Sequence, residues 1–481
     1  MAASLAPTVA REALLARFVQ ALGPAGVLSA GADMEPYAAD WRGRVRATPL
    51  AVLRPASSAE VAAAVHICAQ TQTALVPQGG NTGQCAGAIP SAEGEQVVLS
   101  LSRLNRIRSL DVANNTITVE AGCVLARVQE AAAGADRLFP LSLGAEGSCQ
   151  IGGNLSTNAG GTAVLRYGNA REMVLGLEVV LADGSLWDGL RALRKDNTGY
   201  DLKQLFLGSE GTLGVITAAV LKLYPAPKAA ATVLFSVPEP AVAVDMLNRF
   251  RARCGDRLTG FELMSRLCLD ILFKQIPRFS DPFASRYDWY VLGELRDTQG
   301  ARELRTMAEA TLEAGMREGR VHDAIVANSQ AQAEHLWRMR EEIPEANRRE
   351  APWVRHDVSV PVSRIAQFIT RASETLRTRF PGVRIVAFGH IGDGNIHFNA
   401  TAAAGSDVED FIARQHDVYA LVHDLVMSLG GSFSAEHGIG LVKVDELARY
   451  KSPTELALMQ RLKAALDPAG ILNPGKVLPS R

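Results

Sequence analysis

The chain has 481 residues, of which 47% are hydrophobic and 21% charged, and its formal net charge at pH 7 is -1. These values are typical of a globular protein with two or three domains, and they argue against long disordered or coiled-coil segments. The near-neutral charge provides no field to hold a polyanion, so we predict no nucleic-acid partner. No apolar run reaches the roughly 18 residues of a membrane span, so no transmembrane segment is expected.

The six cysteines are spread along the chain without a C-x-x-C pair, which argues against a zinc ribbon or a disulfide framework. We therefore expect reduced thiols and a cytoplasmic protein. The N-terminal stretch combines an alanine and leucine pattern of helical period with Arg11, Glu12 and Arg17. This pattern indicates an ordinary helix and not a signal peptide.

Short apolar runs and helical patterns alternate between about residues 50 and 225, which predicts a mixed α/β region. The predicted strands are Ala51–Leu53, Val97–Leu101, Thr116–Val119 and Val174–Val180, and the predicted helices are Ser58–Gln70 and Leu125–Ala132.

Three glycine-rich segments interrupt this region, at residues 77–83, 141–161 and 208–214. The first follows an apolar run, so it is expected to be a strand-to-loop turn whose amides can form an anion nest, although an ordinary tight turn fits it equally well. Three such loops, rich in Ser, Thr and Asn, suit a long ligand with a diphosphate. A Rossmann site is not indicated, because no G-x-G-x-x-G opens a helix after an early strand.

Prolines around residues 224–227 and 238–240 place a domain boundary near residue 226. The following region predicts an antiparallel sheet covered by amphipathic helices. The predicted helices are Ala301–Glu313, Gln330–Arg349 and Val362–Arg379, and the predicted strands are Tyr290–Glu294, Val383–Phe388 and Asn395–Asn399.

The segment around the turn Gly392–Asn395 predicts a β-hairpin with His390 and His397 on opposite arms. Opposed Cβ atoms in a hairpin lie about 5 Å apart, near enough for two imidazoles to share one cation. Glu436 is the candidate third ligand, and two histidines with a carboxylate suit Zn, with Mn or Fe as alternatives. The spacing alone fits two solvent-facing hairpin histidines equally well. His437, next to Glu436, is a candidate general base.

Arg340 and Arg355 precede the hairpin. For Arg340 the sequence alone favours a helix-surface ion pair with a nearby glutamate. Asn399 lies two residues past His397 and therefore on the same face of the predicted strand, where it is expected to hydrogen-bond the substrate.

Several motifs together resemble a known flavoprotein family: PQGGNTG, GGNLSTNAGG, LGSEGTLG, FGHIGDGNIHFN, SAEHGIG and DPAGILNPGK. Their first part is similar to the FAD-binding domain of the vanillyl-alcohol oxidase or PCMH type. The C-terminal half resembles the FAD-linked oxidase branch, which includes D-2-hydroxyglutarate and D-lactate dehydrogenases. The likeness covers roughly residues 35–480.

The resemblance implies an α+β protein in three parts. Residues 1–226 would form the PCMH-type FAD-binding domain of two α/β subdomains. Residues 227–430 would form a substrate or cap domain with the antiparallel sheet and the metal hairpin, and residues 431–481 would return to the FAD domain.

The resemblance also implies which residues bind FAD. The first glycine loop would hold the pyrophosphate, residues 142–161 would line the flavin and its ribityl chain, Glu210 and Ile216 would lie near the adenosine half, and Asn473 would return to the isoalloxazine. Residues 77–90 contain no histidine that could attach the flavin, so non-covalent FAD is expected. The full set is Pro77, Gly79, Gly80, Asn81, Thr82, Gly83, Ser142, Gly144, Ser148, Gly152, Gly153, Thr157, Asn158, Gly160, Gly161, Glu210, Gly214, Ile216 and Asn473.

For the substrate side, the family's metal ligands match His390, His397 and Glu436. Its carboxylate-binding arginine matches Arg340, while Pro344 stands at the position of a threonine and Arg355 at that of a lysine. The implied reaction is oxidation of a D-2-hydroxy acid to the 2-oxo acid, best matched by D-2-hydroxyglutarate.

Three alternatives remain at this stage. The substrate could be D-lactate or glycolate, the protein could be a flavin-dependent alkyl transferase, or it could be a non-catalytic subunit of a larger complex. Electron-transfer flavoprotein, a quinone or a cytochrome could each serve as the electron acceptor, and a homodimer is the default assembly.

Overall fold

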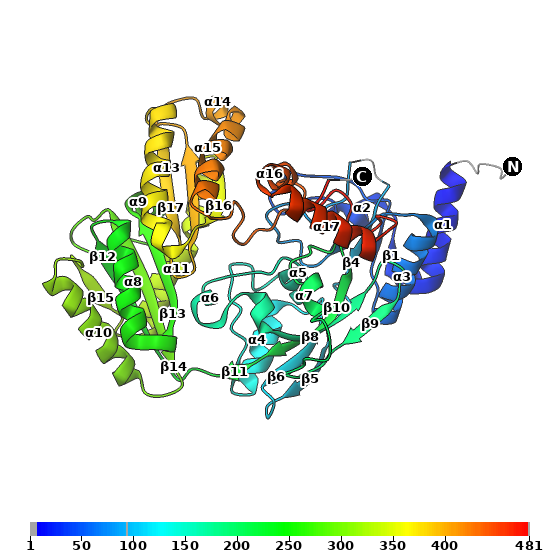
Figure 1. The fold of residues 1–481 in the computed structure, drawn as a ribbon, viewed down its shortest axis with the longest axis horizontal. Coiled ribbons are helices and arrows are strands. Elements are labelled where there is room, and N and C mark those ends of the chain that lie inside the picture. Colours follow the sequence, from blue (N-terminus) through cyan, green and yellow to red (C-terminus); the bar gives the residue numbers. More distant parts are fainter. Residues whose placement is uncertain (1–6, 93–94, 480–481) are drawn as a thin grey trace. The chain divides into compact units, whose positions relative to one another are not determined.

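The computed structural model describes residues 7–92 and 95–479 (Figure 1). Residues 1–6, the start of the predicted N-terminal helix, lie outside this range. The contacts divide the chain into two compact units. The first comprises Met1–Gly160, Asn169–Pro225 and Glu436–Arg481, and the second comprises Gly161–Gly168 and Ala226–Ala435.

The first unit contains a four-stranded sheet in the order β1-β2-β4-β3. Strands β2, β4 and β3 are parallel, and the helix α3 that joins β2 to β3 begins where the Ser57 side chain accepts a hydrogen bond from the Glu60 amide, a helix N-cap. The strands are β1 Val27–Leu28, β2 Ala51–Leu53, β3 Leu75–Gln78 and β4 Val97–Ser100. The helices are α1 Pro7–Leu22, α2 Gly31–Met34 and α3 Ser58–Thr71, with the short turns η1 Pro24–Gly26 and η2 Glu35–Tyr37.

A five-stranded antiparallel sheet in the order β5-β6-β10-β8-β9 completes the first unit, with a short β7–β11 pair. Its strands are β5 Ile107–Asp111, β6 Thr116–Glu120, β8 Val174–Val180, β9 Leu186–Gly189 and β10 Val215–Lys222, and the pair is β7 Arg137–Leu138 with β11 Tyr224–Pro225. The remaining helices are α4 Leu125–Gly134, α5 Ile151–Ser156, η3 Ala170–Met173, α7 Lys203–Phe206, α16 Val444–Tyr450 and α17 Pro453–Leu466.

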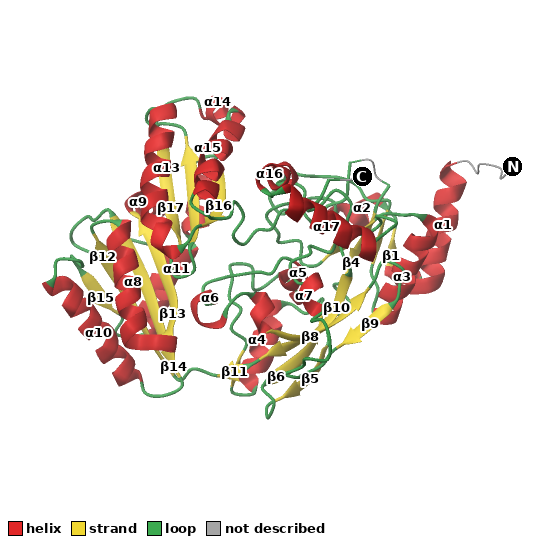
Figure 2. Ribbon diagram, in the orientation of Figure 1, coloured by secondary structure: helices red, strands yellow, loops and turns green. Residues whose placement is uncertain are grey.

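The second unit is built on a seven-stranded sheet in the order β15-β12-β14-β13-β17-β18-β16 (Figure 2). Every neighbouring pair is antiparallel, which confirms the predicted sheet. The strands are β12 Ala229–Val237, β13 Leu258–Ser265, β14 Trp289–Asp297, β15 Ala324–Val326, β16 Val354–Ser359, β17 Arg384–His390 and β18 Asn395–Thr401.

Helices cover both faces of this sheet because strands β12, β13, β14 and β17 carry apolar residues on both sides. One core cluster joins Phe261, Phe398 and their neighbours to α8, α10, α13 and α15, and a second joins Met264 and Phe388 to α9, α11 and α12. The helices are α6 Val164–Tyr167, α8 Pro240–Cys254, α9 Arg266–Gln275, α10 Ala301–Arg317, α11 Gln330–Glu341, α12 Ile343–Glu350, α13 Ile365–Arg379, α14 Val408–Ala413 and α15 Gln415–Ser428, with the short turns η4 Gly255–Arg257 and η5 Val362–Arg364.

Two predicted helices differ from the observed ones. The single helix expected over residues 330–349 is two helices, α11 and α12, which meet at Glu342. Pro344 lies in the first turn of α12, where its missing N–H costs nothing, so a new helix begins there. The helix expected from Val362 begins with η5, and α13 proper starts at Ile365.

The last part of the chain packs within the first unit. The Leu75 amide donates to Ile471 O at 2.8 Å, and the ammonium of Lys463 donates to Thr212 O and Leu472 O. The thiols of all six cysteines are buried. Within the described residues, no helix combines the length and apolar character that a bilayer crossing requires.

Candidate active site

One face of the second unit's sheet gathers the polar residues. Residues paired directly across antiparallel strands lie on the same face, as do residues two apart on one strand. The register pairs Glu262 with His390, Asp357 with His397, and Arg355 with Asn399. Because His397 and Asn399 are two apart, these pairs form a polar strip across β13, β17, β18 and β16.

The two histidines of the hairpin lie close together, as the sequence predicted. Their ring centroids are 5.8 Å apart. His397 pairs with Phe388 and not with His390, so the two imidazoles are diagonal neighbours. The turn is held by Asp393, whose carboxylate accepts the Asn395 amide at 3.0 Å, as expected of a turn aspartate.

Glu262 holds His390 on one side and Arg340 on the other. Its Oε1 accepts from His390 Nδ1 at 2.6 Å, and its Oε2 accepts from Arg340 Nε at 2.7 Å. Glu262 is 0% exposed, Arg340 6% and His390 8%. Burial acts to raise the pKa of Glu262, but the charges of His390 and Arg340 outweigh it and lower the pKa to about 2. Arg340 is therefore a buried residue, and not on the helix surface.

Asp357 lies beside the second histidine. Its carboxylate is 3.7 Å from His397 Nδ1 and accepts a hydrogen bond of 3.0 Å from Asn395 Nδ2. The Ala435 amide donates to the backbone oxygen of Asp357 at 3.0 Å. Glu436 follows Ala435 in the chain, so the Cα atoms of these two residues are about 3.8 Å apart.

In the first unit, the segment after His437 is held by Glu210. Its carboxylate accepts the amides of Ile439 at 2.7 Å and Gly440 at 2.8 Å. Burial raises the pKa of Glu210, although both amides and Lys443 act to lower it. The family resemblance implies that Glu210 lies near the adenosine half of FAD, and in the structure its carboxylate holds this loop.

The three glycine-rich loops lie together in the first unit. A Cβ on Gly80 would be 2.2 Å from Ser148 O, and one on Gly211 would be 3.0 Å from Pro77 Cγ. The Glu210 amide donates to Ser156 O at 2.8 Å, and Asn473 Nδ2 donates to Glu210 O at 2.8 Å. The loops therefore approach one another closely: only glycine fits at Gly80, and at Gly211 the φ of +72° also favours glycine.

Nearly all the predicted FAD residues belong to this region. One group follows β3 or lies at its end: Pro77, Gly79, Gly80, Asn81, Thr82 and Gly83. A second group lies in or next to α5: Ser142, Gly144, Ser148, Gly152, Gly153, Thr157, Asn158 and Gly160. The others lie after α7, in β10 or after α17: Glu210, Gly214, Ile216 and Asn473. Gly161 falls in the short stretch that belongs to the second unit.

The cradle fits an extended flavin nucleotide. At Gly83, Gly144 and Gly153 no atom lies within 4 Å of the position that a Cβ would take, so the backbone there faces open space. Asn473 Oδ1 and Gln150 Oε1 are buried acceptors without a hydrogen-bond partner among the described residues. Such acceptors are suited to the N–H and O–H groups of a dinucleotide.

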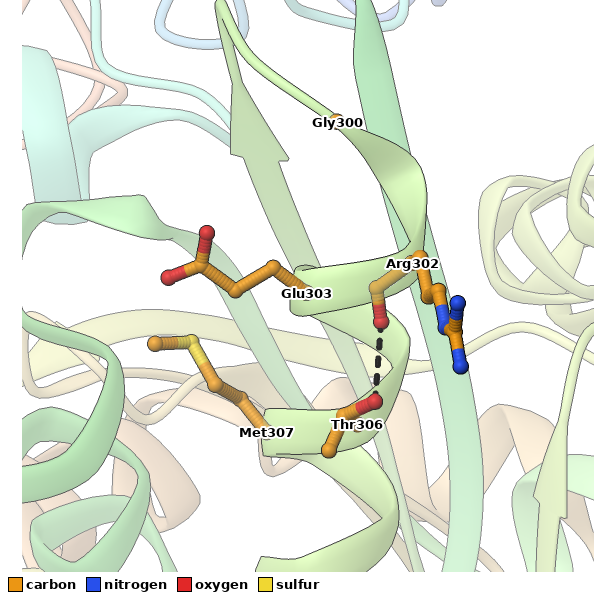
Figure 3. A pocket seen from close by; sticks show the side chains of 5 residues that line it. All are labelled: Gly300, Arg302, Glu303, Thr306 and Met307. Atoms are coloured by element: carbon orange, nitrogen blue, oxygen red, sulfur yellow. Dashed lines mark hydrogen bonds between the residues drawn. The ribbon is translucent and has the colours of Figure 1, made fainter.

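A hollow on the first turns of α10 is not this site. It is lined by Gly300, Arg302, Glu303, Thr306 and Met307, and Thr306 Oγ1 donates to Arg302 O at 3.0 Å (Figure 3). It contains none of the predicted site residues.

The sequence interpretation missed Glu262 and Asp357. Each is a single acidic residue inside a strand: Glu262 within LTGFELMS and Asp357 within VRHDVS. A charged residue at a buried strand position requires a partner. The presence of an acidic residue within each strand is therefore the signal that could have identified Glu262 and Asp357.

Comparisons with known proteins agree with this architecture. The model of the FAD binding domain matches residues 49–189, and that of the FAD linked oxidases, C-terminal domain, matches residues 226–477. The chain therefore belongs to the FAD-linked oxidase family, as its motifs predicted, and it is an FAD-dependent oxidoreductase.

Its relatives include several proteins named D-2-hydroxyglutarate dehydrogenase. The one from Xanthomonas citri pv. viticola is 41% identical over 446 residues, which is 93% of this chain and 93% of the relative. The mitochondrial enzyme of Rattus norvegicus is 39% identical over 476 residues, covering 98% of this chain and 86% of the relative.

Solved structures of lower identity share the fold. A p-cresol methylhydroxylase matches with a TM-score of 0.76 and 17% identity, over 98% of this chain and 97% of its own. An alkyldihydroxyacetonephosphate synthase matches with a TM-score of 0.72 and 18% identity, over 98% and 85%. These likenesses confirm the predicted PCMH-type fold.

Proposed function

We propose that the protein oxidises D-2-hydroxyglutarate to 2-oxoglutarate. The observation that carries the proposal is the polar strip on one face of the second unit's sheet, which contains His390, His397, Arg355 and Asn399, with Arg340 of α11 bonded to Glu262 of this strip. A family of relatives 35–41% identical and named for this reaction supports the choice of substrate.

The substrate carries two carboxylates and a hydroxyl, and each has a candidate partner. Arg340 and Arg355 bind the distal carboxylate, since a guanidinium can hold both of its oxygens. Asn399, the cross-strand neighbour of Arg355, donates a hydrogen bond to the substrate. His437 takes the hydroxyl proton as general base.

His390, His397 and Glu436 are proposed to hold a divalent metal. Two imidazoles and a carboxylate suit Zn, with Mn or Fe as alternatives. A metal held by these residues would supply a Lewis acid for the hydroxy acid. Non-covalent FAD, held by the glycine cradle, would supply the hydride acceptor.

The test is anaerobic reduction of the flavin. The purified yellow protein is mixed with D- and L-2-hydroxyglutarate, D- and L-lactate, D-malate and glycolate, with and without EDTA followed by added Zn or Mn. We expect bleaching by D-2-hydroxyglutarate that EDTA abolishes and metal restores. If only D-lactate or glycolate bleaches the flavin, that acid is the substrate in place of D-2-hydroxyglutarate. If no acid bleaches it, the result favours an alkyl transferase.

Two further proposals concern the assembled enzyme. Electron-transfer flavoprotein or a quinone reoxidises the flavin, which stopped-flow mixing of the reduced protein with each acceptor tests. A homodimer is the proposed assembly, and sedimentation velocity distinguishes it from a monomer.

A further inference from the structure

Glu262 lies between two parts of the second unit to which we assign different tasks. One oxygen faces the proposed metal ligand His390, and the other faces Arg340, the proposed partner of the substrate's distal carboxylate. We infer that Glu262 is a positioning residue that couples metal binding to recognition of this carboxylate. The inference rests on the function proposed above.

The contact with His390 selects the ring nitrogen that meets the metal. A carboxylate only accepts hydrogen bonds, so His390 must donate its Nδ1–H to Glu262. The tautomer that results presents Nε2 to a cation. A carboxylate behind a ligating imidazole also fixes the plane of the ring and makes the ligand more basic, and its loss typically weakens metal binding by about 10-fold to 100-fold.

The contact with Arg340 fixes the guanidinium in the same way. Its Nε bonds Glu262, and its charge lies 4.8 Å from the centre of the Phe388 ring. With Nε engaged, the two terminal Nη groups form the fork that can bind a carboxylate through both oxygens. One buried carboxylate therefore sets the orientation of both groups.

A glutamine cannot replace this carboxylate. Glu262 accepts from both neighbours, whereas an amide has one accepting oxygen and one donating nitrogen. If the amide oxygen faces Arg340, the NH₂ faces His390 Nδ1, which can accept it only after the ring proton has moved to Nε2. If the amide is turned the other way, the NH₂ faces the Nε–H of Arg340. The Glu262→Gln variant therefore keeps the size of the side chain and either reverses the His390 tautomer or loses the contact with Arg340.

Glu294 provides a matched control. It lies on β14, beside the strand of Glu262, and it also reaches α11, where it accepts from Trp337 Nε1 at 2.9 Å. Its other oxygen accepts from Arg296 Nε at 2.6 Å, and the residue is 7% exposed. Glu294→Gln therefore disturbs a comparable buried carboxylate that holds the same helix without contacting His390.

The experiment measures Zn affinity in the FAD-loaded full chain after EDTA treatment, by competition with a chromophoric chelator. We expect Glu262→Gln to weaken Zn binding about 10-fold to 100-fold, and Glu294→Gln to change it less than about threefold. In steady-state assays, Glu262→Gln should also raise KM for D-2-hydroxyglutarate more than KM for D-lactate.

A second measurement separates this inference from the proposed function. ¹⁵N-histidine NMR of the metal-free protein, with the signal assigned through His390→Gln, reports the His390 tautomer directly. We expect the Nδ1–H form in the parent protein and its loss in Glu262→Gln. If the parent binds no Zn, the proposed metal site fails, and the tautomer alone decides the role of Glu262.

Two results overturn the inference: a Glu262→Gln protein with the parent's Zn affinity and tautomer, or an equal loss of Zn affinity in Glu294→Gln. If Glu262→Gln does not fold, Glu262→Asp is measured in the same way. It keeps the charge, but its shorter side chain cannot reach both partners.

Discussion

At the scale of single residues, Gly160 leaves room for the carboxylate of Glu436. A Cβ on Gly160 would lie 2.7 Å from Glu436 Oε1, so Gly160→Ala must displace the end of that flexible side chain. Because we propose Glu436 as a metal ligand, the expected result is a loss of Zn affinity of about tenfold. Competition with a chelator measures it.

The control is Gly134→Ala, where no atom lies within 4 Å of the new Cβ. Both variants should melt within a few degrees of the parent, since the displaced atom is the end of a side chain. A Gly160→Ala protein that keeps the parent's Zn affinity would argue against Glu436 as a ligand.

Glu210 offers a second prediction at this scale. Its two oxygens accept the Ile439 and Gly440 amides, and a glutamine can satisfy only one of them. Glu210→Gln should loosen the loop beside His437 and lower kcat by about tenfold, because small misplacements of a catalytic group are costly. The exposed control Glu130→Gln should keep the parent's kcat, and an unchanged kcat in Glu210→Gln would restrict Glu210 to a structural role.

The hairpin and its histidines could be predicted from sequence because the turn chemistry and the spacing are local. The partners of those histidines could not. Glu262 is 128 residues from His390, and only the order of strands in the folded sheet brings them together. For the same reason, the sequence alone favoured a surface ion pair for Arg340. Glu341 and Glu342 are next to it along the chain, whereas its actual partner Glu262 is not.

At the scale of elements, Arg108 links strands β5, β6 and β8 to helix α3. Its guanidinium bonds Glu178, Glu120 and Ser58. Burial acts to raise the pKa of both glutamates. Hydrogen bonds outweigh it and lower each pKa below 4.5: Glu120 is bonded by arginines, and Glu178 by Arg108, Ser58 and Thr217. Arg108→Met leaves these carboxylates short of a partner, so we expect a loss of about 3 kcal/mol in unfolding free energy, measured by urea denaturation.

The pH dependence of this loss follows from the sign of the shifts. A carboxylate whose folded pKa is lowered stabilises the protein above its unfolded pKa, and this contribution disappears as the pH falls through the folded pKa. The difference between Arg108→Met and the parent should therefore shrink below about pH 4.5. A difference that stays constant with pH would mean that Arg108 acts through packing alone.

Strands β14, β17 and β18 and helices α10 and α13 of the second unit could be predicted because their periodicities are strong. The break between α11 and α12 was missed because the residues on both sides keep a helical pattern. The single proline within that pattern, Pro344, begins a new helix in place of kinking the old one.

At the scale of the whole molecule, removal of FAD should affect the two units differently. A ligand stabilises the fold that binds it, by about 2.7 kcal/mol at a concentration 100 times its Kd. In hydrogen exchange of the apoprotein, we expect faster exchange in residues 77–83 and 148–161 and unchanged exchange in β13 and β14. Equal acceleration in both units would place the flavin's stabilising effect beyond the glycine cradle.

The burial of every cysteine has a practical consequence for reactivity. Burial raises the pKa of Cys68 to about 12 and those of Cys123 and Cys268 to about 11, so almost no nucleophilic thiolate exists at neutral pH. Ellman's reagent should therefore modify less than one thiol per native chain and all six after denaturation.

Because its own thiols are unreactive, the protein can be labelled specifically at introduced cysteines. One cysteine introduced at exposed Arg302 and another at exposed Glu130 would be the sole targets of a maleimide dye or spin label, with one in each unit. The distance between the two probes could then be followed through turnover in the otherwise native sequence.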